Sequence, residues 1–196
     1  MRSVLIGGIG NVLLGDDGVG PCVARLLDEM YSFGDQAEIV DLGTPALDLT
    51  HQIASRPAVI LVDCVASDEH AAGTVILYRK EDILRVTPAQ RLDPHSSALS
   101  ECLMTAELLG QSPDRVLLVG IVGKNFEPDC ALSLEVRHAV QKAIETVLTE
   151  LEALGVQPIP NTSRCVANVP AGSAKTIWES RTGSGKIDVE VDTLSV

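Results

Sequence analysis

Residues 4–20 read VLIGGIGNVLLGDDGVG, an apolar run followed by closely spaced glycines and two adjacent acids. The run Val4-Leu5-Ile6 is typical of a buried strand, and the glycines after it predict a tight loop. From Val19 to Met30, apolar residues recur every three or four positions, as on one face of a helix. The stretch therefore predicts a strand, a loop and a helix, a unit that is typical of α/β proteins.

Strands and helices are predicted to alternate along the rest of the chain as far as residue 154. The patterns predict strands at 38–41, 58–63, 74–78 and 115–122, helices at 46–54, 97–109 and 132–154, and a loop through Pro88 and Pro94. Two of the strands are continuous apolar runs, which is typical of parallel strands covered on both faces. We therefore predict an α/β fold, a three-layer sandwich with a twisted, mostly parallel sheet flanked by helices.

We expect one folded domain over residues 1–158 and a C-terminal extension over residues 159–196. The extension is rich in Ser, Thr and Gly and has little helical periodicity, so we expect it to be flexible or to bind a partner. Within it, residues 187–192 alternate between apolar and acidic side chains. They are expected either to form an edge strand or to become a strand when a partner binds.

Composition and charge exclude several classes of function. The 196 residues carry 15 Lys and Arg against 27 Asp and Glu, a net charge of −12, which argues against nucleic acid or an anionic membrane as partner. No apolar run approaches the roughly 18–20 residues of a membrane span. The five cysteines are scattered without a C-x-x-C pair, which favours a reducing, cytoplasmic compartment.

A dinucleotide site is also disfavoured, although a glycine-rich loop lies between a strand and a helix. Leu13 stands where the G-x-G-x-x-G motif needs its third glycine. The carboxylates of Asp16 and Asp17 would repel a pyrophosphate at the start of the helix. These two features count against a nucleotide-binding oxidoreductase.

Three side chains are candidates for a metal site: Asp17, Asp63 and His95. Asp63 ends the predicted strand 58–63, and His95 follows Asp93-Pro94 just before the next helix. Because the carboxyl ends of parallel strands meet at one edge of a sheet, we expect all three to gather there. Two carboxylates and one imidazole with open positions suit a borderline ion such as Ni²⁺ or Zn²⁺.

Each candidate also has a purely structural explanation. An Asp at the start of a helix can cap backbone N–H groups, which accounts for one acid of the pair and leaves the second unexplained. Asp63 could end a strand in a turn, and a lone His in a loop is often only solvated. Cys22 and Cys64 are alternative nucleophiles, but we expect both to be buried core residues.

These residues resemble the motifs of the hydrogenase maturation endopeptidases. The similar segments are Gly8-Ile9-Gly10-Asn11 with Leu13, Asp16-Asp17-Gly18 with Gly20, Asp41-Leu42-Gly43-Thr44, Leu61-Val62-Asp63, His95, and Gly120-Ile121 with Leu132-Ser133 and Val136. The resemblance covers roughly residues 1–155. The chain departs from the family pattern after Gly120-Ile121, where Val122-Gly123-Lys124 replaces a short stretch that contains proline.

The resemblance implies a function, a fold and a set of site residues. The family clips a C-terminal extension from the large subunit of nickel–iron hydrogenases, so the implied partner is the precursor of such a subunit. Asp17, Asp63 and His95 match the positions that recognise nickel already placed in the precursor and support its cleavage. Zinc or cadmium is expected to substitute for nickel in a crystal.

Asp41 matches a position that the family associates with the choice of substrate. Asn11 and Thr44 lie in the same matching motifs, so we expect all three residues to contact the substrate. A module that senses a metal in its partner without cutting it remains an alternative, because the same three ligands would serve that role. Action as a monomer on a larger partner fits either hypothesis, and the sequence leaves the oligomeric state open.

Overall fold

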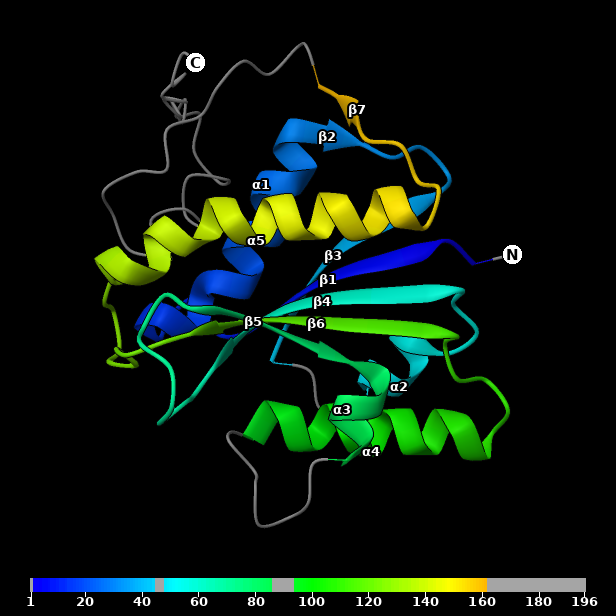
Figure 1. Ribbon diagram of the computed structural model, residues 1–196, viewed down its shortest axis with the longest axis horizontal. Helices are drawn as coiled ribbons and strands as arrows, with labels where there is room; N and C mark the ends of the chain where they lie inside the picture. Colours follow the sequence, from blue (N-terminus) through cyan, green and yellow to red (C-terminus); the bar gives the residue numbers. More distant parts are fainter. Residues whose placement is uncertain (1, 45–47, 86–93, 162–196) are drawn as a thin grey trace.

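The computed structural model of the protein describes residues 2–44, 48–85 and 94–161 (Figure 1). Within these ranges, five strands form the main sheet, in the order β3-β1-β4-β6-β5. The strands are β1 (Val4–Ile9), β3 (Ala37–Gly43), β4 (Ala58–Val65), β5 (Val75–Arg79) and β6 (Arg115–Val122). The first four in that order run parallel, and β5 pairs antiparallel with β6 at one edge. The predicted α/β fold with a mostly parallel sheet is confirmed.

Helices cover both faces of this sheet, so the molecule has three layers (Figure 1). One face carries α1 (Val19–Met30) and α5 (Leu134–Ala153), while the other carries α2 (Asp48–Ile53), α3 (Lys80–Arg85) and α4 (Pro94–Leu108). Each face has its own apolar core, and successive residues of β4 contribute to opposite cores. Val62 belongs to the core under α1 and α5, and Leu61 to the core under α2 and α4. In the described ranges, no helix is long and apolar enough to cross a membrane.

Most predicted elements are present, with ends shifted by a few residues. The strand at 115–122 agrees residue for residue, and α5 lies within the predicted 132–154. β4 continues two residues beyond Asp63, so this acid lies inside the strand and not at its end. α4 begins at Pro94 and not at 97, because proline suits the first position of a helix. His95 therefore lies in the first turn of α4, which corrects its predicted place in a loop.

A short helix and a pair of short strands are present that the sequence patterns do not predict. α3 buries only Ile83, so it shows no apolar periodicity, and the N–H of Arg79 before it donates to Asp82 Oδ2 at 2.9 Å. β2 (Tyr31–Ser32) pairs antiparallel with β7 (Ile159–Pro160), which joins the first residues of the predicted extension to the end of α1. Residues 162–196, including the predicted strand at 187–192, lie outside the described residues, as do residues 46 and 47 of the predicted helix 46–54.

Two glycines allow the segment after β1 to pack tightly on the sheet. Gly10 has a φ of +134°, and a Cβ there would overlap the backbone oxygen of Asp17. A Cβ on Gly20, in the first turn of α1, would overlap the backbone oxygens of Ile9 and Val62. The start of α1 therefore lies directly against the backbones of β1 and β4, close to their carboxyl ends.

We expect Gly20→Ala to destabilise the protein, although helix propensity alone would favour alanine by about 1 kcal/mol. The overlap with two backbone oxygens should lower the free energy of unfolding by about 1–3 kcal/mol or more, as measured by urea denaturation. Gly34→Ala is the control, because nothing lies within 4 Å of a Cβ there. This control should cost only the strain of its positive φ, about 1–2 kcal/mol. A stabilised Gly20→Ala protein would contradict the close packing.

Candidate active site at the carboxyl edge of the sheet

The carboxyl ends of β1 and β4 lie side by side where the connections of the chain diverge. From β1 the chain passes through α1 to β3, which pairs with one side of β1. From β3 it passes through α2, on the opposite face of the sheet, to β4, which pairs with the other side of β1. In open α/β sheets, ligands bind in the crevice at such a point. The 3-10 turn η1 (Gly15–Gly18) lies between β1 and α1 and contacts β4. The turn that carries Asp17 and the strand that carries Asp63 are therefore packed together.

Asp17 is half-buried in η1, at this edge of the sheet. Its Oδ2 accepts a hydrogen bond from the N–H of Asn11 at 2.7 Å, and its own N–H donates to the carbonyl of Leu14 at 3.0 Å. Among the described residues, none donates a hydrogen bond to its Oδ1. The backbone of Asp17 is fixed, while one carboxylate oxygen is available to a ligand.

Asp63 is buried within β4, with 2% of its surface exposed. Its Oδ1 accepts a hydrogen bond from the N–H of Cys64 at 2.8 Å. Because Val62 and Cys64 face the layer of α1 and α5, Asp63 faces the layer of α2 and α4. Asp63 is thus a buried carboxylate on the face that α4 covers.

His95 lies in the first turn of α4. Figure 1 shows this end of α4 at the edge of the sheet where the parallel strands finish. The His95 side chain lies outside the described residues. Among the side chains that are described, no three His, Cys, Asp or Glu residues are arranged to hold a metal ion. The set of Asp17, Asp63 and His95 therefore stays a prediction, with its three elements located at one edge.

The predicted substrate-recognition residues Asn11, Asp41 and Thr44 lie at the same edge of the sheet. The N–H of Gly10 donates to the carbonyl of Gly43 at 2.7 Å, which joins the loop after β1 to the turn after β3. Asn11 Oδ1 accepts from the N–H of Leu13 at 3.0 Å, and Asp41 Oδ1 accepts from the N–H of Gly43 at 2.9 Å. Asp41 and Thr44 are exposed and Asn11 is half-buried, and of the three only Asn11 has a recorded hydrogen bond to Asp17, through its N–H.

Asp16 has a role that sequence reasoning missed. Neither acid of the pair caps its own helix, which corrects that structural explanation. The Asp16 carboxylate is fully buried and accepts four hydrogen bonds from the β6–α5 connection. The N–H groups of Lys124 and Asn125 donate to Oδ2 at 2.9 and 3.0 Å, and Ser133 donates its N–H to Oδ1 at 2.6 Å and its Oγ–H to Oδ2 at 3.0 Å.

The two adjacent carboxylates therefore do not need a cation between them. Asp16 points into a set of N–H groups beside the start of α5, where the helix dipole also favours a negative charge. Asp17 points the other way, toward Asn11. No sequence signal links Asp16 to residues more than a hundred positions away.

The cysteine alternatives are not supported. Burial raises the pKa of the Cys22 thiol from 9.0 to about 12. Cys64 is buried with its side chain on the α1 and α5 face, opposite to Asp63. Neither thiol is placed as a nucleophile toward the crevice.

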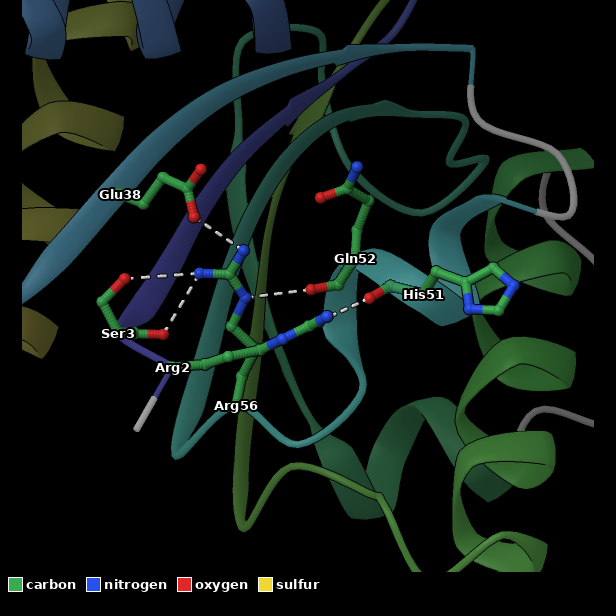
Figure 2. A pocket seen from close by; sticks show the side chains of 6 residues that line it. All are labelled: Arg2, Ser3, Glu38, His51, Gln52 and Arg56. Atoms are coloured by element: carbon green, nitrogen blue, oxygen red, sulfur yellow. Dashed lines mark hydrogen bonds and ion pairs between the residues drawn. The ribbon is translucent and has the colours of Figure 1, made fainter.

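A hollow of about 470 Å³ lies at the other edge of the sheet (Figure 2). Arg56 Nη2 pairs with Glu38 at 2.7 Å, and its Nε donates to the carbonyl of Gln52 at 3.0 Å. Arg2 Nη1 donates to the carbonyl of His51 at 2.7 Å. These guanidinium groups satisfy carbonyls at the end of α2, which gives them a structural role.

Three kinds of similarity to known proteins agree. A family model described as hydrogenase maturation protease matches residues 21–150. The hydrogenase 2 maturation protease of Escherichia coli K12 is 31% identical over 157 residues, covering 80% of this chain and 95% of that protein. The structure of the E. coli hydrogenase maturating endopeptidase HybD is similar with a TM-score of 0.75 and 30% identity, over 82% of this chain and 99% of that one. The [NiFe] hydrogenase maturation protease HybD of Thermococcus kodakarensis is similar with a TM-score of 0.63 and 26% identity, over 76% and 98%.

We expect the two adjacent acids to differ sharply in their effect on stability. Asp16→Asn turns an amide NH₂ toward buried N–H donors and should lower the free energy of unfolding by about 2–4 kcal/mol. Asp17→Asn keeps an oxygen for the N–H of Asn11 and should cost less than about 1 kcal/mol. Urea denaturation of both variants measures the difference. Equal losses would show that Asp16 is no more structural than Asp17.

We expect Cys22 to resist alkylation in the folded protein. With a pKa of about 12, roughly one thiol in ten thousand is ionised at pH 8, and only the thiolate reacts. Mass spectrometry after brief iodoacetamide treatment should find Cys22 unmodified and the half-buried Cys130 modified. Urea should make the two equally reactive. Rapid native labelling of Cys22 would reopen the nucleophile hypothesis.

Proposed function

Because the chain belongs to the hydrogenase maturation protease family, we propose that it removes the C-terminal extension from the precursor of a nickel–iron hydrogenase large subunit after nickel insertion. In this proposal, Asp17, Asp63 and His95 bind the nickel that the precursor already holds. The metal is then part of the substrate. The names of the relatives support a hydrogenase maturation protease, and the nickel recognition is our inference from the residues.

The observation that carries this proposal is the packing of η1 against β4 at the carboxyl edge of the sheet. It brings the backbone that carries Asp17 next to the strand that carries Asp63. Asp17 has one carboxylate oxygen without a donor among the described residues. This oxygen favours a cation that arrives from outside.

The donor set fits nickel bound in a partner. Two carboxylate oxygens and one imidazole nitrogen leave coordination positions open, so a metal could keep its ligands in the precursor while contacting this protein. Because these contacts exist only when the metal is in place, binding would distinguish a loaded precursor from an empty one. Asn11, Asp41 and Thr44 would contact the precursor around the metal.

Cleavage then follows the chemistry of amide hydrolysis. A water molecule, polarised by the nickel or deprotonated by a carboxylate of this chain, attacks the scissile carbonyl carbon. The new C–O bond forms, the C–N bond breaks, and the leaving amine takes up a proton. The extension departs as a peptide, and the shortened large subunit keeps its nickel.

We expect cleavage to require both nickel and Asp17. The nickel-loaded precursor of the host hydrogenase large subunit is incubated with the full chain, and intact mass reports loss of the extension. The wild-type protein should cleave the loaded precursor and leave the nickel-free precursor intact. Asp17→Asn should lower the rate at least 100-fold, because the nickel loses a ligand. Asp35→Asn removes one charge from the exposed loop before β3 and should keep full activity.

Two outcomes would contradict the proposal. Cleavage of the nickel-free precursor at the same rate would remove nickel recognition and leave an ordinary endopeptidase. Nickel-dependent binding without cleavage, lost in Asp17→Asn, would indicate the alternative metal-sensing module.

A further inference from the structure

We propose that Asp16 is a positioning residue: its buried carboxylate fixes η1 so that Asp17 meets the metal in the correct orientation. This inference rests on the proposed function, in which Asp17 is a nickel ligand. It concerns the first acid of the pair, which itself does not face the crevice. η1 is held in place from two sides.

On the inner side, η1 is held by close packing on the sheet. The backbone oxygen of Asp17 lies where Gly10 would carry a Cβ, so the turn cannot move toward β1. This contact is steric and prevents movement in one direction only. It does not prevent the turn from lifting away from the sheet.

On the outer side, Asp16 holds η1 by hydrogen bonds. Its carboxylate accepts from the N–H groups of Lys124, Asn125 and Ser133, and its own N–H donates to the carbonyl of Asn125 at 2.8 Å. These bonds join the turn to the β6–α5 connection and to the cap of α5. They oppose the lifting motion that the glycine contact permits.

Asp16 and Asp17 share one four-residue turn, so a displacement of the first moves the second. The structure supplies no substitute for the carboxylate, because no Lys or Arg of the described residues pairs with Asp16. An amide at this position can accept on one oxygen only. Asp16→Asn would therefore lose either the Ser133 N–H or the two N–H groups of Lys124 and Asn125.

Small displacements of a catalytic group have large effects on rate. A misplacement of about 1 Å can cost about 100-fold in turnover. We therefore expect Asp16→Asn to lower kcat on the nickel-loaded precursor by about 10- to 100-fold, with a smaller change in KM. Hydrogen exchange of peptides covering residues 11–18 should become faster at the same temperature.

The control separates positioning from general loss of stability. Val147 is fully buried in α5, distant in sequence from η1, so Val147→Ala destabilises the same core without touching Asp16. At a temperature where both variants are folded, Val147→Ala should keep kcat within about twofold and leave exchange of residues 11–18 unchanged. Ser133→Ala removes one of the four donors and should give an intermediate loss of kcat, which Ser133→Thr should largely restore.

The outcomes distinguish this inference from the proposed function. If wild-type protein fails on the loaded precursor, or Asp17→Asn is fully active, the proposed function fails. If Asp17→Asn is inactive while Asp16→Asn matches Val147→Ala in kcat and in exchange, the positioning role is overturned and the function stands. If Asp16→Asn does not fold, Ser133→Ala and Ser133→Thr decide the question, and equal kcat in both would overturn the role.

Discussion

The hydrogen bonds to the buried Asp16 carboxylate join two corners of the fold that are more than a hundred residues apart in the chain. One corner is the turn between β1 and α1, and the other is the connection between β6 and α5. Because an unpaired buried carboxylate is costly, the N–H groups of both segments must stay in place around it. This constraint shapes the rim of the candidate site, although Asp16 itself faces away from it.

The adjacent acids show how one sequence motif can contain a structural part and a functional part. Backbone N–H groups and the start of α5 stabilise the negative charge of Asp16, so this charge does not require a metal ion. Asp17 has one carboxylate oxygen to which no residue of the described ranges donates a hydrogen bond. The glycines on the inner side allow the backbones to approach so closely that the turn has little freedom. The chain belongs to the hydrogenase maturation protease family, and in the proposed function only Asp17 of this pair would bind the metal.

Agreement between the sequence patterns and the structure depends on burial. The long apolar strands and amphipathic helices α1 and α5 bury one or both faces, so their periodicity predicts them well. α3 buries only Ile83, and the β2–β7 pair contains two residues on each side, so neither leaves a pattern in the chain. The ends of elements also differ: Asp63 lies inside β4, and His95 lies inside α4. At those positions hydrogen bonding across the sheet and the preference of proline for a helix start decide the boundary.

The sequence by itself determined the α/β class, the mostly parallel sheet, the family, and the three residues proposed to bind nickel. These follow from local periodicity and from short motifs, which act over a few residues. Only the tertiary structure decided that the Asp16 carboxylate is hydrogen-bonded to the β6–α5 connection, that Asp63 faces the α4 layer, and that Asn11, Asp41 and Thr44 lie at the same edge of the sheet. Such relations depend on which segments pack together, because hydrogen bonds and close contacts form between groups that the chain order does not bring together.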